Sequence, residues 1–585
     1  MNNQFISLAT AAALLSLGFA ACNKVDVQNP DVNPSGMTKA YAKVAISMPK
    51  TTSSRSGVTF NDGGIDPGVA SESLVKDIQL AIYDEYGTYI GVGTLVSEMD
   101  FEGADEPQLD KDNVSDTYTK TFELNMAEGA NAPAQIVAFI NMDASTKNLD
   151  ELLANGKVTE DAYSTEEKGF IMTNSGYYND KDEYVVAVDI PEDAIYHDEK
   201  KPSDKVVEIY VERLAAKVIV DVDKKVDETA NYVVYDANGD QVQLKYTPKY
   251  WGATGTAKKE NLVKTAFDKS EDTTPSWMND ASKFRSYWAN GVNWGLESWE
   301  DYYVTENEDE APLNYLTFGD MKGVGESGSG KEPESMIGIG VPNYVLEHTS
   351  PLGIEQMNLI TNTYVIVTGT YTVMKDEEAH TDFTADGEGN VDFYLLLNGE
   401  ENGKKKYTVY NKSQLIAYLL KRNDVEAIYS DADAEQKINA DEYDKKLDLK
   451  YNFDLNQYVL AAKEGITVYT GKNEEFDAET MKKSTNSRHY CFPEGGAYFN
   501  VPIAQNTTET VTTYGVVRNH SYVLTINKIE NLGAPLDPNE FITDPDDPDP
   551  DPTPVIPDPN DFQDNFIKAE INVLSWHVVN NGVTL

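Results

Sequence analysis

The part of this chain that most constrains its fold is the C-terminal end, residues 543–585. It begins with a proline–aspartate spacer, 543–561, and ends with a strand-like segment, 562–585. Proline fixes φ and has no N–H, so we expect the spacer to be an extended arm whose aspartates repel one another. An apolar strand on such an arm must pair with a sheet, either in its own chain or in another molecule.

The terminal segment alternates apolar and polar residues, which is the period-2 pattern of a half-buried strand. The alternation changes phase after Val573. This change predicts either one bulged strand or two short strands. The apolar residues of the two phases are Ile567, Ala569, Ile571 and Val573, followed by Leu574, Trp576 and Val578.

The N-terminus carries the pattern of an exported protein. A short polar start is followed by an apolar run, 5–21, which is too short to span a membrane and is typical of a secretory leader. Small residues stand directly before Cys22, in the sequence LSLGFAAC. We therefore expect lipid attachment at Cys22, with ordinary signal-peptidase cleavage nearby as the alternative. The mature protein is then exported and at most lipid-anchored.

A second strand pattern follows the leader. Residues 40–48 alternate, with Val44, Ile46 and Met48 on one side. A linker rich in Ser, Thr and Gly comes next and contains Arg55, which is followed by Ser56. An arginine among small residues is accessible to a trypsin-like protease. On composition alone, an ordinary exposed arginine is the simpler interpretation.

The composition indicates a large, acidic, globular protein. The chain has 585 residues, 40% hydrophobic and 25% charged, so it is long enough for two or more packed domains. Its formal net charge of −50 argues against nucleic-acid binding, which needs clustered Lys and Arg. With only two cysteines there is no disulfide framework, and Cys491 is expected to be a buried strand residue.

Short β-prone segments separated by turn signals recur along the chain. They predict an all-β dominated fold with two β-sandwich domains, of transthyretin-like, Greek-key type, and a C-terminal extended strand arm. Helical patterns are few and short. Residues 145–155 have a cap-like start and a leucine stripe, and residues 411–424 have Asn411 or Ser413 as the N-cap.

Two features of the strand pattern leave alternatives open. The long β-prone stretch 206–225 contains Arg213 and Lys217, which we expect to face an edge or to pair with acids, because an unpaired buried cation is costly. Five tryptophans lie between Trp251 and Trp299. They indicate core and loop packing, with carbohydrate stacking as the alternative.

Motifs for catalysis are not found. The sequence has no nucleophile elbow, P-loop, HExxH, CxxC pair or dinucleotide fingerprint, and its six histidines have no ligand spacing. We therefore expect no enzymatic activity and no cofactor. Two acidic stretches, 110–116 and 384–392, resemble calcium loops without fitting the EF-hand spacing, so a structural calcium ion is the alternative there.

Four stretches together resemble the fimbrillins, the type V pilins of Bacteroidales, and most closely the family of the minor fimbrium's shaft subunit. They are the leader LSLGFAAC, YVERLAAKVIV (210–220), PNYVLEHTSP (342–351) and YGVVRNHSYVLTINKIENLGAP (514–535). As in that family, the last stretch is followed by a Pro/Asp spacer and a terminal strand containing a tryptophan.

This resemblance implies a mechanism of assembly. The subunit is exported as an outer-membrane lipoprotein, and an Arg-specific, trypsin-like protease cuts after Arg55 and removes the segment that holds the 40–48 strand. The C-terminal strand of a neighbouring copy then inserts into the vacated groove. Partners implied are copies of itself, anchor and tip accessory pilins, the processing protease and a host or bacterial receptor, in a surface fimbrium that supports adhesion and biofilm formation.

The domain organisation expected on this basis has six parts. They are a lipoprotein leader at 1–22, a removed segment at 23–55, an N-terminal sandwich at 56–210, a C-terminal sandwich at 211–542, the spacer at 543–561 and the donor region at 562–585. The alternative functions are a surface lipoprotein or a tip or accessory adhesin that binds a glycan or protein, and a secreted hydrolase.

Overall fold

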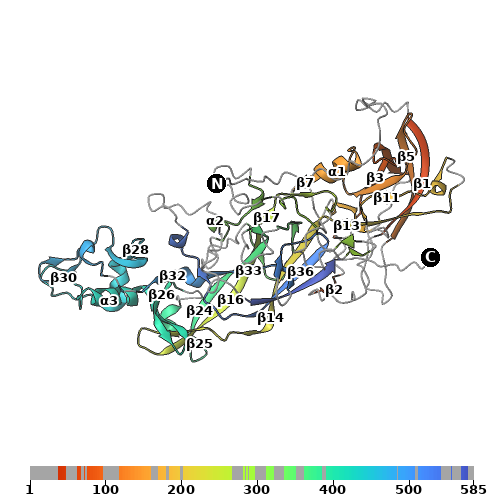
Figure 1. The fold of residues 1–585 in the computed structure, drawn as a ribbon. Helices are drawn as coiled ribbons and strands as arrows, with labels where there is room; N and C mark the ends of the chain where they lie inside the picture. The colour runs from red at the N-terminus through yellow and green to blue at the C-terminus, as the bar shows by residue number, and fades with distance from the viewer. Residues whose placement is uncertain are drawn as a thin grey trace, which may run out of the picture.

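The structure is a computed structural model of the 585-residue chain. It describes residues 37–47, 62–66, 72, 75–96, 117–159, 169–178, 183–197, 202–265, 281–282, 285–286, 289–294, 296, 311–321, 335–350, 361–384, 391–483, 485, 487–507, 512–541, 555 and 568–576. The molecule is elongated, with an N-terminal sheet at one end, a sandwich of two sheets in the middle and a small helical region at the other end (Figure 1).

The N-terminal domain is built on one nine-stranded sheet, with the order β11-β6-β3-β4-β5-β1-β13-β8 and β12 paired to β1. Its strands are β1 (Met37–Ser47), β3 (Ile78–Tyr83), β4 (Tyr89–Leu95), β5 (Thr117–Ala127), β6 (Gln135–Ile140), β8 (Met172–Asn174), β11 (Val188–Asp189), β12 (Ile195–Tyr196) and β13 (Val207–Arg213). β8 pairs with β13 and also with β6, so the sheet closes on itself. A closed sheet leaves few free edges, and β1 is one of its interior strands.

The C-terminal domain is a sandwich of two sheets. The smaller has five strands in the order β2-β38-β36-β14-β23. These are β2 (Asp62–Asp66), β14 (Ala215–Asp227), β23 (Asn343–Leu346), β36 (His520–Lys528) and β38 (Lys568–Trp576). The larger has ten strands, β15 (Tyr232–Tyr235), β16 (Gln241–Thr254), β22 (Ile337–Gly338), β24 (Tyr364–Lys375), β25 (Glu378–Ala379), β26 (Phe393–Glu401), β27 (Lys404–Asn411), β32 (His489–Phe492), β33 (Gly496–Pro502) and β37 (Ala534–Pro535).

The remaining elements are short. Two-stranded pairs are β9 (Tyr177–Tyr178) with β10 (Tyr184–Val185), β17 (Thr256–Ala257) with β21 (Leu313–Asn314), β18 (Lys259–Asn261) with β7 (Lys157–Thr159), β19 (Ala281–Ser282) with β20 (Arg285–Ser286), β28 (Leu447–Asn452) with β29 (Gln457–Ala462), β30 (Tyr469–Gly471) with β31 (Glu474–Glu475), and β34 (Ala504–Thr507) with β35 (Thr512–Tyr514). The α-helices in the described residues are α1 (Leu149–Asn155), α2 (Phe318–Met321) and α3 (Lys412–Arg422).

These elements confirm the all-β dominated fold with a few short helices. Both predicted helices are present, and Asn411 rather than Ser413 caps α3: its side chain accepts from the Gln414 N–H while Gln414 accepts from the Asn411 N–H, a capping box. Cys491 is buried in β32, as expected. Trp251 is fully buried in the sandwich core, which favours packing over carbohydrate stacking at that position.

One part of the fold was missed by the sequence reasoning. Strands β26 and β32 have two buried faces, since Phe393 and Leu395 belong to the sandwich core while Tyr394 and Leu396 belong to a separate hydrophobic cluster. That second cluster is formed with α3 and β28–β29, from the segment between β27 and β32. This segment forms the end of the molecule opposite the N-terminal sheet (Figure 1).

The two domains are joined by one continuous stretch of strand. β13 runs in the N-terminal sheet to Arg213, and β14 enters the sandwich at Ala215. Arg213 and Lys217 are both buried, so the prediction that they face an edge is wrong, and the alternative of pairing with an acid is confirmed for Lys217. Lys217 forms an ion pair of 3.0 Å with Glu72, and Arg213 donates from Nη1 to Asn519 Oδ1 at 3.2 Å. These buried cations are tolerated because the ion pair and the hydrogen bonds offset the hydration that each of them loses.

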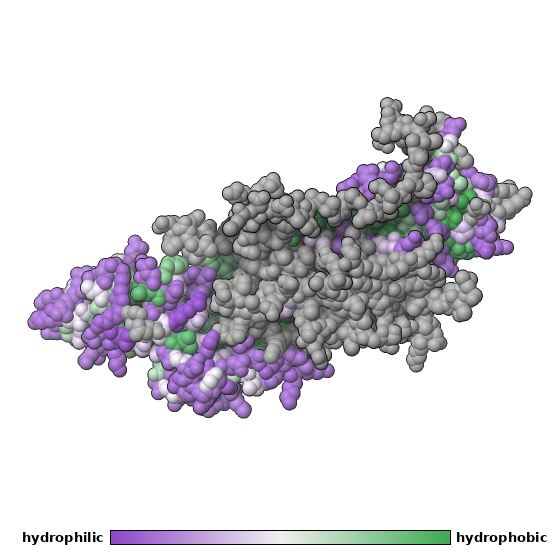
Figure 2. Space-filling model, viewed as in Figure 1, coloured by the Kyte–Doolittle hydropathy of each residue, from purple (hydrophilic) through white to green (hydrophobic). Residues whose placement is uncertain are grey.

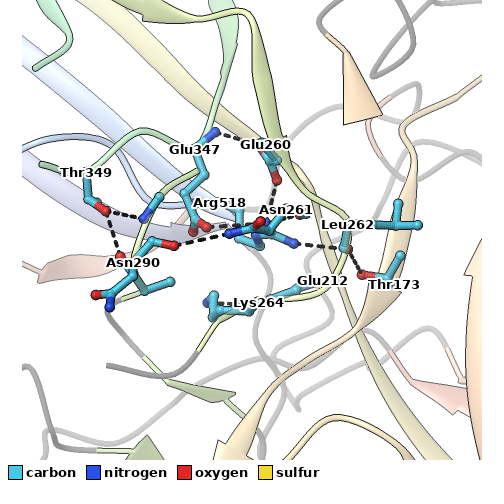
Figure 3. A network of polar contacts seen from close by, with 12 residues as sticks. Thr173, Glu212, Glu260, Asn261, Leu262, Lys264, Asn290, Glu347, Thr349 and Arg518 are labelled. Atoms are coloured by element: carbon cyan, nitrogen blue, oxygen red, sulfur yellow. Dashed lines mark hydrogen bonds and ion pairs between the residues drawn. The ribbon is translucent and has the colours of Figure 1, made fainter. Parts of the chain in front are cut away.

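A second buried network crosses the same junction (Figure 3). Arg518, which precedes β36, lies 2.8 Å from a carboxylate oxygen of Glu260 and 3.3 Å from one of Glu347. Lys264 lies 3.0 Å from Glu212 of β13. All five side chains are at most 1% exposed. The contacts tie β13 of the N-terminal domain to the loops of the C-terminal domain.

The charges in this network balance only when one carboxyl holds a proton. Arg518 and Lys264 face three carboxyl groups, those of Glu212, Glu260 and Glu347. Burial raises the pKa of Glu260 to about 8, against the opposing attraction of Arg518. A proton on Glu260 at neutral pH would leave two cations against two carboxylates in this buried site.

Replacing Glu260 by Gln is expected to flatten the pH dependence of stability between pH 6.5 and 8. The folded chain keeps a proton that the unfolded chain releases above pH 4.5, so the free energy of unfolding falls toward pH 8, by up to about 1.4 kcal/mol per unit. His348 and His489, whose pKa burial lowers to about 4, act in the opposite sense, but only below their ordinary 6.5. Equal slopes for wild type and E260Q in urea unfolding would contradict the protonated carboxyl.

Candidate functional site: the first strand and the tail strand

The first strand, β1, lies inside the N-terminal sheet. It pairs antiparallel with β5 along its whole length, from Met37 opposite Ala127 to Ser47 opposite Thr117. On its other side it runs parallel to β13, from Val44 opposite Val207 onward. Both rows of its backbone N–H and C=O groups are therefore used in pairing over the second half of the strand. Removing β1 would leave two unpaired strand edges facing each other across a groove.

The side chains of β1 form part of the domain core. Ala40, Ala42 and Val44 are fully buried and Ile46 is 1% exposed, and all four belong to the same hydrophobic cluster as β3, β5 and β6. The strand predicted at 40–48 is thus present, with Val44 and Ile46 on the buried side. Met48 lies outside the described residues.

The other face of β1 makes polar and aromatic contacts near the surface. Lys39 forms an ion pair of 2.7 Å with Glu123, and this bond lowers the pKa of the Glu123 carboxyl. Tyr41 stacks on Tyr196 with ring centroids 5.8 Å apart. Exposed ion pairs contribute little to stability, so the burial of the alternate residues and the backbone pairing hold β1 in place.

The tail strand, β38, is docked on its own chain. It pairs antiparallel with β36 and parallel with β2, so it lies between them in the five-stranded sheet. In the register with β36, Val573, Ile571 and Ala569 stand opposite Tyr522, Leu524 and Ile526. These three residues of β36 are fully buried in the sandwich core.

The change of phase at Val573 does not divide the tail. The register with β36 continues without a break from Val573 opposite Tyr522 to Ser575 opposite His520, so the alternative of two short strands is wrong. The irregularity nearest Val573 lies on the other neighbour: Val573 stands opposite Asp62 and Ser575 opposite Ile65, which places an extra residue in β2 at Gly63–Gly64. The pairing with β36 shifts only farther along, between Ile526 and Lys528.

Several predicted site residues fall outside the described part of the chain. These are Cys22, Met48, Arg55, Ser56, Ile567 and Val578. Lipidation, the protease cut and the ends of the donor segment therefore stay predictions. Of the two calcium-like stretches, 110–116 lies outside the described residues, as does most of 384–392.

Sequence reasoning missed two partners at this site. The N-terminal sheet closes because β8 pairs with both β13 and β6. A periodic pattern in the sequence does not specify which strands pair. The strand β2, with the sequence DGGID, was assigned to a linker, because two glycines are unfavourable in strands. The isolated Ile65 after two glycines was the only signal available.

The described surface offers little apolar area for ordinary docking. On the face drawn in Figure 2, its residues are mostly hydrophilic at the end formed by α3 and β28 and along the edge near β25. Large hydrophobic side chains exposed among the described residues are Tyr86, Val96 and Val341. They are too few to form a stable apolar interface on the described surface.

The described residues contain neither a metal-binding cluster nor a membrane-spanning helix. Their His, Cys, Asp and Glu side chains include no group of three or more that could hold a metal ion. None of their helices has the length and apolar character needed to cross a membrane.

Comparison with known proteins gives one family match. Residues 490–582 match the family model described as major fimbrial subunit protein type IV, fimbrillin, C-terminal. This stretch contains β36 and the tail strand. A search of curated proteins found no match.

Solved structures similar to this chain include three from fimbrial systems. A fimbrilin (fimA) from Porphyromonas gingivalis W83 is 13% identical, with 92% of this chain and 99% of that chain covered and a TM-score of 0.33. The tip fimbrial protein Mfa3 from Porphyromonas gingivalis, with a C-terminal truncation, is 10% identical, with 92% and 100% covered and a TM-score of 0.30. A fimbrial assembly protein from Parabacteroides distasonis ATCC 8503 is 12% identical, with 59% and 85% covered and a TM-score of 0.24.

Replacing Val44 by Asp is expected to destabilise the uncut chain by about 3 kcal/mol or more, because the change removes a buried valine and places an unpaired carboxylate in the core. Lys43→Asp is the matched control, since Lys43 is only half-buried and lies on the other face of the strand. Urea unfolding of both variants measures the difference. Equal losses in the two would show that β1 contributes little through its buried face.

Proposed function

We propose that this chain is a shaft subunit of a cell-surface fimbrium. In this proposal the subunits polymerise by protease-triggered strand exchange. The proposal starts from the match of residues 490–582 to the fimbrillin family model, which indicates a fimbrillin-type protein. A protease cuts after Arg55, β1 leaves with the released segment, and the tail strand of a neighbouring copy fills the groove. Adhesion and biofilm formation follow from the polymer, whose other partners are anchor and tip pilins.

The observation that carries this proposal is the position of β1. It is an interior strand with four inward residues at most 1% exposed, yet it stands before Arg55 in the sequence and so lies in the part that a cut would release. A cut after Arg55 would detach such a strand from the rest of the chain, although the core of the folded domain depends on it. Its loss uncovers the core under Val44 and Ile46, each of which contributes roughly 1.5–3 kcal/mol of burial.

The tail strand has the composition that such a groove requires. β1 presents Ala40, Ala42, Val44 and Ile46 inward. The tail offers Ile567, Ala569, Ile571 and Val573 in the same order, with an alanine and then two β-branched residues at the last three places. In this alignment the side chains of the tail and of β1 have similar volumes at three of the four positions. With the tail in the reversed direction, Val573 and Ile571 would replace the two alanines of β1.

The proposed alignment makes a definite pairing. Ala42 of β1 stands opposite Phe122, so Ala569 of the incoming strand would take the place next to this large, fully buried ring. Glu570 would take the place of Lys43, opposite Thr121. The backbone ladder with β5 and β13 supplies affinity, and the alternate side chains supply register.

Uncut chains should stay monomeric, because β1 fills the groove and the sheet has no open edge there. Trace trypsin should convert the lipid-free chain into polymers, visible as ladders on unboiled gels, and Arg55→Ala should prevent this. Ile571→Asp should also prevent it, because it places a charge in the groove, whereas Asn572→Asp on the opposite side of the strand should polymerise normally. Cut wild-type chains that remain monomeric at high concentration would overturn the proposal.

The alignment itself can be tested by cross-linking. Cysteines at Glu570 and Thr121 should form a disulfide between adjacent subunits of the polymer, because the alignment makes them direct partners. The pair at Glu570 and Glu123, which stands opposite Tyr41, corresponds to a slip of two residues and serves as the control. Cross-linking of the control pair alone would reject the alignment while leaving strand exchange itself intact.

A further inference from the structure

The strand β2 covers the outer edge of the tail strand. It spans Asp62–Asp66 and runs parallel to β38, on the side opposite β36. Within the described residues its strand pairing is with β38 alone. A tail that is to enter another subunit must therefore separate from β36 and also from β2.

The attachments of β2 differ on its two sides. Downstream, the chain is fixed at Glu72, which is 1% exposed. The Glu72 carboxylate pairs with Lys217 at 3.0 Å, and its carbonyl oxygen accepts from Arg213 Nε at 2.6 Å. Upstream, residues 48–61 connect β2 to β1, which is itself fixed in the N-terminal sheet. In the uncut chain β2 thus stands in the sequence between two fixed points, β1 and Glu72.

The cut site proposed above lies within that upstream connection. Arg55 stands between Ser47, where β1 ends, and Asp62, where β2 begins. A cut after Arg55 leaves β2 on the mature chain but frees its upstream end. Its downstream attachment at Glu72 is unaffected, because the buried contacts of Glu72 are with β13, β14 and Tyr344.

We propose that β2 retains the tail strand on its own sheet until the cut, so that one cleavage activates the acceptor groove and the donor strand together. This inference rests on the proposed function and specifies its regulation. A short edge strand with an irregular register pairs weakly by itself. Fixing both of its ends lowers the entropic cost of keeping it paired, and freeing one end raises that cost.

The consequence is an ordered release. Once β2 separates, β38 becomes the edge strand of the five-stranded sheet and is held by β36 alone. An edge strand can leave without breaking a second ladder. Before the cut, the same arrangement keeps the apolar tail away from other molecules while no groove is open to receive it.

A disulfide between β2 and the tail tests the proposal directly. Ile65 and Ser575 are direct partners in the parallel register, so cysteines at these positions should cross-link in the uncut chain. Cys491, which is buried and free, is replaced by Ala in every chain compared. The matched control places cysteines at Asp221 and Thr525, a parallel pair in the same sheet that does not involve the tail.

After cleavage, the oxidised Ile65–Ser575 variant should polymerise about tenfold more slowly or not at all, and reduction should restore the wild-type rate. The oxidised Asp221–Thr525 control should polymerise as wild type does. Polymerisation of the oxidised Ile65–Ser575 variant at the wild-type rate would overturn the role of β2 and leave the proposed function standing. Failure of cut wild-type chains to polymerise would instead overturn the proposed function.

Hydrogen exchange tests whether the cut is what loosens β2. At a concentration low enough to keep cut chains monomeric, amides of 62–66 and 568–576 should exchange about tenfold faster or more in cut chains than in uncut ones. Amides of β24 serve as the internal reference, and Arg55→Ala treated with protease should behave as the uncut chain. Unchanged exchange in both segments after cleavage would overturn the coupling.

Discussion

The buried contacts around Arg518 are the constraint on which the arrangement of the two domains depends. This guanidinium is fully buried and pairs with Glu260 and Glu347, and its Nη atoms donate to the carbonyls of Asn261 and Leu262. Such a group cannot lose a partner without leaving a charge in the interior, at a cost of several kcal/mol. The junction therefore fixes the N-terminal sheet that holds β1 relative to the sheet that holds the tail strand, as the proposed fibre would require.

The segments that carry the family resemblance meet at this junction. The strand 210–220 crosses it, Glu347 and His348 belong to the second segment, and Arg518 and Asn519 belong to the third. Asn519 has a φ of +58°, donates its N–H to the Ala215 carbonyl and accepts from Arg213. The three segments thus supply buried polar residues to the same junction, where Arg213, Glu347, Arg518 and Asn519 form hydrogen bonds or ion pairs with one another.

Much of the local structure follows from the sequence, but its partners do not. The period-2 pattern predicted β1 and the buried positions Val44 and Ile46, and capping chemistry predicted α3. The same pattern in the tail could not choose between its own sheet and another molecule, because alternation specifies a face and not a neighbour. The alternation pattern also could not predict that Arg213 bonds to the Glu72 backbone, 141 residues away. It did not identify β2 either, because the glycines of β2 are typical of a linker.

In the proposed fimbrium, a net charge of −50 on each subunit favours a mode of assembly that does not bring large surfaces together, because like charges oppose it. Strand exchange meets this requirement, since the backbone ladder is neutral and the side chains that enter the groove are apolar. The same property makes an open groove and a free tail hazardous to the monomer. The closed N-terminal sheet hides one, and the position of β38 between β36 and β2 hides the other. Both are hidden by strand pairing. The proposed cut lies between β1 and β2 in the sequence, so that this one cleavage would act on both.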